Sequence, residues 1–325
     1  MKIRKTTRVL AIALLVNSCT PPENNRDWEC IAPANPGGGW DLACRVTARA
    51  MEQTGLSPGP VRVTNIPGAG GGVAFANAVT QRSDHGNVLF SASPATTLRL
   101  AQGQFGHLTV DDVRWIGAVA AEYGIIAVSQ DAPWETLNDL MADWARDPSS
   151  LVVAGGSAAA GQDHMKVMLL ARSAGITPGQ VRYVPFDGGG EALTALLGGF
   201  VSVFPGEASE AEAQLEAGNI RILAVLAPER IPGPLAEVPT AREQGFDVVW
   251  ITWRGFYVPN GITEAEYDRW VATLSDLEAS SVWQEALRQH RLRPFSIVGA
   301  EFEEFVREQV NDFEQLSRDI GLIRE

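Results

Sequence analysis

The sequence is poor in lysine, because Lys166 is the only lysine after Lys5. The 325 residues carry a formal net charge of −13, which becomes −17 without the four cations of the leader described below. So acidic a chain is a poor partner for nucleic acid or for an anionic membrane surface. A site for an anion must therefore use backbone N–H groups, hydroxyls or arginine.

Histidine and cysteine are scarce as well, with four and three residues respectively. The histidines are scattered along the chain, and no Cys or His pair has the spacing of metal ligands. We therefore expect neither a metal nor a cofactor.

The first 19 residues predict a signal peptide. Basic residues precede an apolar run, Val9–Val16, that would span only about 12 Å as a helix, too short to cross a bilayer. Cys19 ends the sequence Val-Asn-Ser-Cys, which resembles a lipobox, the site at which bacterial lipoproteins are cleaved and acylated. Ordinary signal-peptidase cleavage is the alternative. With a lipid on Cys19, residues 20–27 would form a polar tether and the only link to the membrane.

Cys30 and Cys44 would then lie in an oxidising compartment. A disulfide between them would close a loop of about fifteen residues, worth about 3 kcal/mol in the chain-entropy model. Two buried free thiols are the alternative.

Short apolar segments alternate with Gly- or Ser-rich loops and helical patterns, which is typical of an α/β fold with mostly parallel strands. The length favours two domains. We expect lobe 1 to comprise 28–122 and 254–325, and lobe 2 to comprise 123–253, with two crossing strands between them. The expected strands are 28–32, 61–65, 88–92, 115–120, 125–129, 151–154, 181–184, 201–204, 222–226 and 248–258, the last broken at Arg254. The expected helices begin near 42, 73, 134, 163, 191, 208, 264, 282 and 301, the last three spanning 264–279, 282–290 and 301–320, and a further helix follows the loop 91–97 and ends near 101.

Three consecutive glycines, Gly37, Gly38 and Gly39, lie between a predicted strand and a predicted helix. Free N–H groups and the helix dipole make such a helix N-terminus a site for an anion. A tight turn that merely needs positive φ is the alternative. Four further Gly- or Ser-rich loops, 67–72, 91–97, 155–162 and 185–190, also follow strands, where ligands of open α/β sheets bind.

These loops also contain two patterns that suggest other functions. The glycines at 68–72 do not make a dinucleotide motif, because Val73 stands where the third glycine should be. Ser157 and His164 suggest a secreted serine hydrolase, but the nucleophile-elbow pattern lacks its last glycine and His164 lies about two turns into a helix. For Glu207 and Arg254 the sequence is compatible both with contact to a ligand and with a structural role.

Five motifs together resemble the periplasmic receptors of tripartite tricarboxylate transporters, also called Bug receptors. They are P-A-N-P-G-G-G-W-D at 33–41, N-I-P-G-A-G-G at 65–71, G-S-A-A-A-G-Q-D-H at 156–164, P-F-D-G-G-G-E-A-L-T-A-L-L-G-G at 185–199 and W-R-G-F-Y-V-P at 253–259. The resemblance covers nearly the whole chain beyond the leader. Phe186-Asp187 stands where Tyr-Lys is common in the family, so one cation near the ligand is lost.

The resemblance implies a two-lobed type II periplasmic-binding fold and a non-enzymatic role in transport. A small di- or tricarboxylate would bind between the lobes and pass to membrane permease subunits; a receptor that only signals is the alternative. The Cys30/Cys44 pair looks like the subgroup associated with citrate-like ligands. The implied ligand-binding residues are Gly37, Gly38, Gly39, Trp40, Asp41, Ser93, Thr96, Ser157, Gly161, Gln162, Phe186, Asp187, Gly188 and Gly189.

Overall fold

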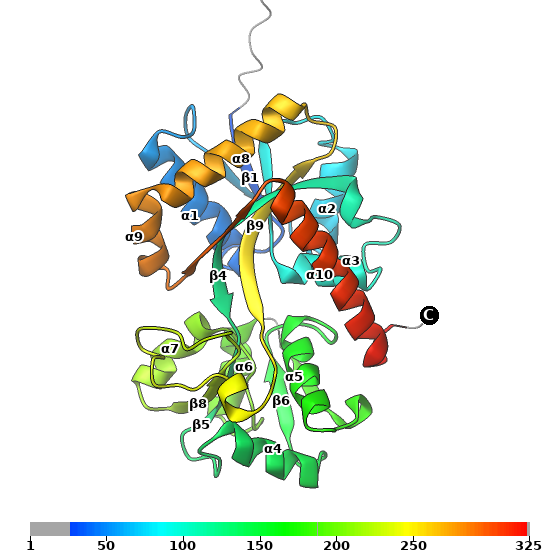
Figure 1. The fold of residues 1–325 in the computed structure, drawn as a ribbon, viewed down its shortest axis with the longest axis vertical. Coiled ribbons are helices and arrows are strands. Elements are labelled where there is room, and N and C mark those ends of the chain that lie inside the picture. Colours follow the sequence, from blue (N-terminus) through cyan, green and yellow to red (C-terminus); the bar gives the residue numbers. More distant parts are fainter. Residues whose placement is uncertain (1–26, 187, 324–325) are drawn as a thin grey trace, which may run out of the picture.

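Two α/β lobes joined by long strands make up the chain, as the computed structural model shows (Figure 1). The structure describes residues 27–186 and 188–323. The predicted signal peptide, the lipidation of Cys19, most of the tether and the role of Asp187 therefore lie outside the described residues. Within the described part, no helix is both long and apolar enough to cross a membrane.

Lobe 1 is built on a six-stranded sheet in the order β10-β4-β9-β3-β1-β2. Strands β2, β1 and β3 are parallel to one another, whereas β9, β4 and β10 join antiparallel. The expectation of mostly parallel strands thus holds only for the first half of this sheet. The bounds are β1 Glu29–Ala32, β2 Arg62–Asn65, β3 Val88–Ala92, β4 Val113–Tyr123, β9 Ile251–Pro259 and β10 Arg293–Val298, with helices α1 Gly39–Thr54, α2 Gly72–Thr80, α3 Pro94–Ala101, α8 Glu264–Ala279, α9 Ser281–Gln289 and α10 Ala300–Asp319.

Lobe 2 contains an antiparallel pair, β5–β8, and a parallel pair, β6–β7. Segment 201–204, expected to be a strand, forms only isolated bridges, at Val203 to β6 and at Phe204 to β5, and so links the two pairs. The bounds are β5 Ile125–Ser129, β6 Val152–Gly155, β7 Arg182–Pro185 and β8 Ile220–Val225, with helices α4 Leu137–Arg146, α5 Gln162–Ser173, α6 Gly189–Leu197 and α7 Ala208–Glu216.

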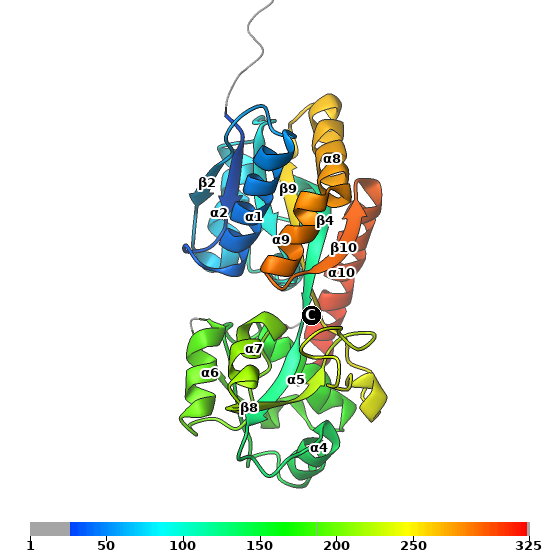
Figure 2. The same ribbon diagram turned by 90° about the vertical axis from the view of Figure 1, so that its left-hand side faces the viewer.

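Strands β4 and β9 pair over their whole length and run from one lobe to the other (Figure 1, Figure 2). The expected break at Arg254 is wrong, because β9 continues through it. The sheet pairs Arg254 with Ala120 and Thr252 with Glu122, which brings the two crossing strands' polar residues together. The two-lobed α/β fold with crossing strands is therefore confirmed.

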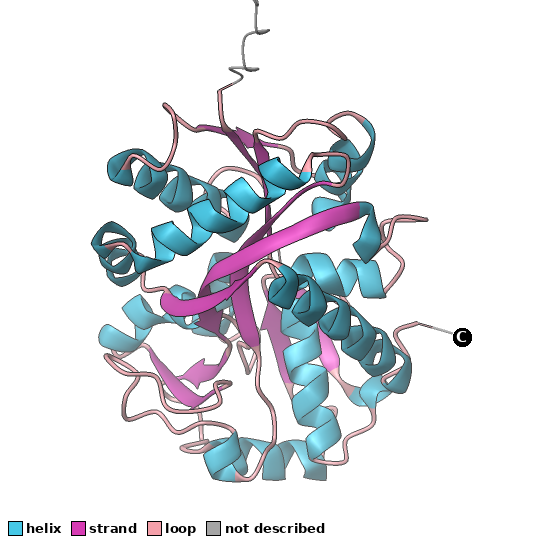
Figure 3. Cartoon of the chain, turned by 45° about the horizontal axis from the view of Figure 1, so that its top comes forward, coloured by secondary structure: helices cyan, strands magenta, loops and turns pink. Residues whose placement is uncertain are grey.

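Helices cover the strands of both lobes, and each lobe has its own apolar clusters (Figure 3). Helix α10 belongs to both. Phe302 and Val306 near its start lie in a lobe 1 cluster, while Leu316 near its end packs against a lobe 2 cluster that includes Ile320. The end of the segment assigned to lobe 1 by sequence thus also braces lobe 2.

The predicted disulfide between Cys30 and Cys44 is confirmed. It ties β1 to α1, with 5.6 Å between the two Cα atoms, and both residues are buried. The loop that carries Gly37, Gly38 and Gly39 lies between the two cysteines. The bond therefore holds together the strand and the helix on either side of this loop.

Replacing both cysteines with alanine should lower the free energy of unfolding by about 3 kcal/mol, because the unfolded chain regains the entropy of the open loop. Urea denaturation of the variant and of the oxidised protein measures the difference. Chemically reduced wild-type protein is the control and should lose a similar amount. Equal stability of the reduced and oxidised proteins would contradict this role.

Candidate ligand-binding cleft

A cleft of about 690 Å³ lies between the lobes. Residues from both lobes and from the crossing strands line it: Ala34, Asn35, Pro36, Gly37, Gly38, Gly39, Trp40, Leu42, Ser93, Ala95, Glu122, Gly156, Gln162, Asp163, Gly188, Gly189, Gly190, Glu207, Ser209, Glu210 and Arg254. These include residues from the N-terminal ends of α1, α3, α5, α6 and α7. Such ends carry free N–H groups and partial positive charge, so their convergence favours an anionic ligand.

The first glycine loop is held by Asp41, which is 2% exposed. The Asp41 carboxylate accepts hydrogen bonds from Gly37 N (2.9 Å), Arg45 Nε (2.8 Å) and Asn65 Nδ2 (2.9 Å). Gly37 has φ +90°, a conformation that favours glycine. Asp41 thus fixes the shape of the loop from behind.

Burial alone would raise the pKa of Asp41, but the hydrogen bonds from Arg45, Gly37 and Asn65 outweigh it and lower the pKa. The carboxylate is therefore ionised and fully engaged at neutral pH. The N–H groups of Gly39 and Trp40, in the first turn of α1, have no acceptor within the helix, and no hydrogen bond joins them to another described residue. We call Gly38, Gly39 and Trp40 the α1 seat.

Trp40 and Ser93 connect the α1 seat to the start of α3. Trp40 Nε1 donates to Ser93 Oγ over 3.0 Å, and Ser93 Oγ also accepts from Ala95 N over 3.3 Å. Thr96 completes this cap, because its Oγ1 accepts from Ser93 N over 3.4 Å. Ser93 thus lines the cleft and caps α3, while Thr96 is not among the lining residues and holds the Ser93 backbone in the capping box.

Arg254 and Glu122 form a buried ion pair between the crossing strands. Arg254 Nη2 lies 2.6 Å and Nε 3.2 Å from Glu122 Oε1. Burial would lower the pKa of Arg254, but Glu122 outweighs this and raises it, so the guanidinium stays charged. A Cβ added at Gly39 would lie 2.7 Å from Arg254 Nη1, which places the guanidinium against the α1 seat.

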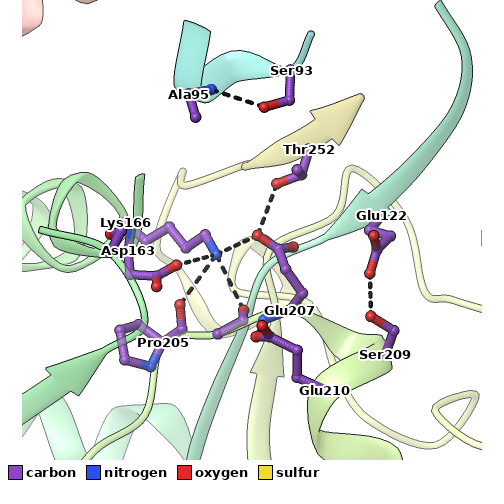
Figure 4. A network of polar contacts seen from close by, with 12 residues as sticks. Ser93, Ala95, Glu122, Asp163, Lys166, Pro205, Glu207, Ser209, Glu210 and Thr252 are labelled. Carbon is purple, nitrogen blue, oxygen red and sulfur yellow. Dashed lines mark hydrogen bonds and ion pairs between the residues drawn. The ribbon is translucent and has the colours of Figure 1, made fainter. Parts of the chain in front are cut away.

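Lobe 2 contributes a buried network around Lys166, drawn in Figure 4. Lys166 Nζ lies 2.9 Å from Asp163 Oδ1 and 2.7 Å from Glu207 Oε1, and it also donates to two backbone carbonyls at 3.2 Å. Burial would lower the pKa of Lys166, but Asp163 and Glu207 reverse this and raise it. Thr252 Oγ1 also donates to Glu207 Oε1, over 2.8 Å. The last lysine of the chain is therefore committed to internal acids.

Glu210 lies beside this network at the start of α7 (Figure 4). Its Oε2 accepts from Glu207 N over 2.9 Å. The residue as a whole is exposed, but its carboxylate lies against the start of α6 at Gly189. Burial there withdraws solvent from the carboxylate, and the Asp163 and Glu207 carboxylates repel its charge. These effects raise the pKa of Glu210 to about 7.

The geometry around Ser157 does not assemble a hydrolase site. Ser157 Oγ accepts from Asp163 N over 3.0 Å and lies 3.3 Å from the Tyr183 hydroxyl. His164 Nδ1 instead accepts from Ala160 N over 2.9 Å, and the His164 ring stacks on Tyr183. Ser157 therefore accepts from an N–H group in the first turn of α5, and His164 binds the backbone just before this helix and packs on Tyr183.

The sequence model described as "Tripartite tricarboxylate transporter family receptor" matches residues 44–322. The chain belongs to this receptor family. Among curated relatives, protein BugT of Bordetella pertussis is 27% identical over 256 residues, 77% of this chain and 75% of BugT.

Solved structures share the receptor's fold. R. palustris Rpa4515, with adipate, gives a TM-score of 0.80 at 22% identity, covering 92% of this chain and 98% of its own. MatC from Rhodopseudomonas palustris, with bound malate, gives 0.74 at 21% identity, covering 90% of this chain and 99% of MatC. At these identities the likeness concerns the fold alone.

The receptor's cleft brings together eight of the residues implied by sequence: Gly37, Gly38, Gly39, Trp40, Ser93, Gln162, Gly188 and Gly189. Five others are not among the lining residues of the described structure, namely Asp41, Thr96, Ser157, Gly161 and Phe186. Their ligand contacts stay predictions.

Sequence reasoning missed Glu122, Asp163, Ser209 and Glu210 and left Glu207 and Arg254 open. A signal did exist for two of them, because Glu207 and Glu210 follow the predicted strand 201–204 at the start of a predicted helix. Of the five Gly- or Ser-rich loops predicted to face the ligand, only the loop 67–72 contributes no residue to the lining of the described cleft.

The two lobe 2 loops are packed backbone to backbone at Gly156. A Cβ added there would overlap backbone atoms of Gly188 and Gly189. We expect Gly156→Ala to destabilise the receptor by about 1–3 kcal/mol, measured by urea denaturation, because the loops must separate. Gly190→Ala is the control, since no atom of the described residues is found within 4 Å of its added Cβ. Equal stability of the two variants would contradict this packing.

Glu210 should make the receptor less stable as pH rises. Its pKa is raised from 4.5 to about 7 by folding, so its contribution is fully present below pH 4.5 and is lost as pH rises through 7. Thermal melts of Glu210→Gln and wild type should therefore diverge between pH 4.5 and 8, with the variant relatively more stable at pH 8. Glu216→Gln, on the same helix but outside the cleft lining, should follow the wild-type curve. Parallel melts of wild type and Glu210→Gln would refute the shift.

Proposed function

We propose that this receptor binds a small carboxylate in the cleft between its lobes and delivers it to the permease subunits of a tripartite tricarboxylate transporter. The observation that carries the proposal is the position of the Arg254 guanidinium against the α1 seat. Backbone N–H groups and an arginine there would give a carboxylate charge-assisted hydrogen bonds.

Relatives support the ligand class. Two structures with the same fold hold adipate and malate, both dicarboxylates. The sequence resemblance adds a preference for di- or tricarboxylates and, through the Cys30/Cys44 pair, for a citrate-like ligand. The family name supports the permease as partner.

The two lobes supply the mechanism. A ligand that contacts α1 and α3 in lobe 1 and α5, α6 or α7 in lobe 2 favours the closed state over the open one. It shifts this balance only by its difference in affinity for the two states. The crossing strands β4 and β9 would carry the hinge, with lobe 1 and lobe 2 divided as the sequence predicts.

We further propose that the receptor acts in the periplasm, exported by residues 1–19 and held at the membrane through a lipid on Cys19. We propose no hydrolase activity, because Ser157 Oγ and His164 Nδ1 each accept a hydrogen bond from a different backbone N–H group. A sensor that only signals would bind the same ligand; loss of carboxylate uptake in cells that lack the receptor distinguishes transport from signalling.

Binding should be visible as a thermal shift of the mature receptor against mono-, di- and tricarboxylates. A ligand at one hundred times its Kd adds about 2.7 kcal/mol to the stability. Gly39→Ala should weaken binding about tenfold or more, because its methyl group would push Arg254 away from the α1 seat. Gly59→Ala should bind like wild type, because its added Cβ meets no atom of the described part of the chain within 4 Å and Gly59 lies outside the cleft lining. The absence of a shift with every carboxylate would reject the proposed function.

A further inference from the structure

The two walls of the cleft differ in charge. The lobe 1 wall presents the α1 seat and the start of α3, with the Arg254 guanidinium beside them and Asp41 held behind the loop. The lobe 2 wall presents Asp163, Glu207 and Glu210. The lobe 1 wall suits a carboxylate, whereas the lobe 2 wall would repel one.

Protein carboxylates already stand at the helix N-termini of lobe 2. Asp163 lies in the first turn of α5, and Glu210 lies in the first turn of α7. A Cβ added at Gly189, the first residue of α6, would overlap the Glu210 carboxylate, so this group also faces α6. A second carboxylate of a ligand would meet Glu210 there.

Glu207 provides an independent indication that the ligand brings a donor. The residue is 4% exposed, and its Oε1 accepts from Lys166 and Thr252. Its Oε2 is buried, receives no hydrogen bond from the described residues and points away from Lys166 in Figure 4. A buried acceptor without a donor costs about 1–3 kcal/mol, and more when charged. Burial accordingly raises the pKa of Glu207, and a cationic N–H group that reaches this carboxylate from the cleft that Glu207 lines would remove the cost.

The charges at the cleft sum to an excess of acid. Four carboxylates, those of Glu122, Asp163, Glu207 and Glu210, face two cations, Lys166 and Arg254, which leaves two negative charges when all are ionised. Burial and the neighbouring carboxylates raise the pKa of Glu207 and Glu210, so a cation on the ligand would favour their ionised forms. A plain dicarboxylate or tricarboxylate would add two or three more negative charges. A positive group on the ligand would offset the excess in a partly buried site, where charge interactions are stronger than in water.

We propose that the cleft selects a carboxylate that also carries a protonated amine. The carboxylate binds at the α1 seat with Arg254, and the ammonium group donates to Glu207 and Glu210. This inference rests on the proposed function of the cleft and narrows its ligand class, and it runs against a citrate-like ligand.

Matched ligand pairs test it by isothermal titration calorimetry on the mature receptor. The pairs are succinate and aspartate, glutarate and glutamate, and butyrate and γ-aminobutyrate, with citrate alongside. At least one amine-bearing member should bind tenfold or more tightly than its parent acid and more tightly than citrate. Parent acids or citrate that bind as well as or better than every amine would overturn this inference and leave the proposed function standing. Absence of binding by every compound would overturn both.

Variants of Glu210 and Glu207 test whether these carboxylates bind the ammonium group of the ligand. Glu210→Gln retains an oxygen to accept from Glu207 N, so the cap of α7 can persist. It should reduce the preference for the amine tenfold or more while parent acids bind as well as before or better. Glu207→Gln should act in the same direction, with thermal melts to check folding because Lys166 loses a charged partner.

Glu216→Gln removes a carboxylate from the same helix outside the cleft lining and is the matched control. It should keep the wild-type preference. An unchanged preference in a folded Glu210→Gln variant, or an equal loss in Glu216→Gln, would overturn the assignment.

Discussion

The ion pair between Arg254 and Glu122 is the interaction on which the cleft depends. It joins the two crossing strands where the lobes meet, and each partner also reaches one lobe. Arg254 lies against Gly39 of lobe 1, and Glu122 accepts a hydrogen bond from Ser209 of lobe 2. Removing one partner of a buried pair typically costs about 3–5 kcal/mol, because the other charge is left unpaired. The same pair therefore braces the strands and places a cation beside the α1 seat.

Backbone geometry does the rest of the positioning. Strands that end at the cleft are followed by helices whose N-terminal residues line it. Partial positive charge therefore gathers at the cleft although no lysine is among the lining residues of the described structure. Lys166 forms ion pairs with Asp163 and Glu207 inside lobe 2. An acidic protein can thus bind an anion, provided that its own acids are turned away from the ligand's carboxylate, as Asp41 is.

The sequence predicted elements where local pattern and burial agree. The expected helix 264–279 has the same bounds as α8, and Thr263 before it forms a capping box with Glu266. Strand 88–92 is buried on both faces and matches β3. Strand β10 was missed because Pro294 and exposed positions hide the pattern of an edge strand that also shifts register against β4. Segment 201–204 reads as a strand because it is apolar, but Pro205 follows at once and only isolated bridges form.

The α/β alternation, the glycine loops at strand ends, the cysteine pair and the family could all be predicted from the sequence, because these depend on local conformation or on ordered motifs. Which side chains meet in the cleft depends on how the distant elements pack. Glu122, Asp163 and Glu210 are far apart in sequence, and no local pattern says that they face one another. Asp41 and Glu210 lie alike in the first turn of a helix, yet one is drawn behind its loop by Gly37, Arg45 and Asn65 while the other faces the cleft. Side-chain direction at a helix start follows from the partners that packing provides, and those partners come from distant strands and loops.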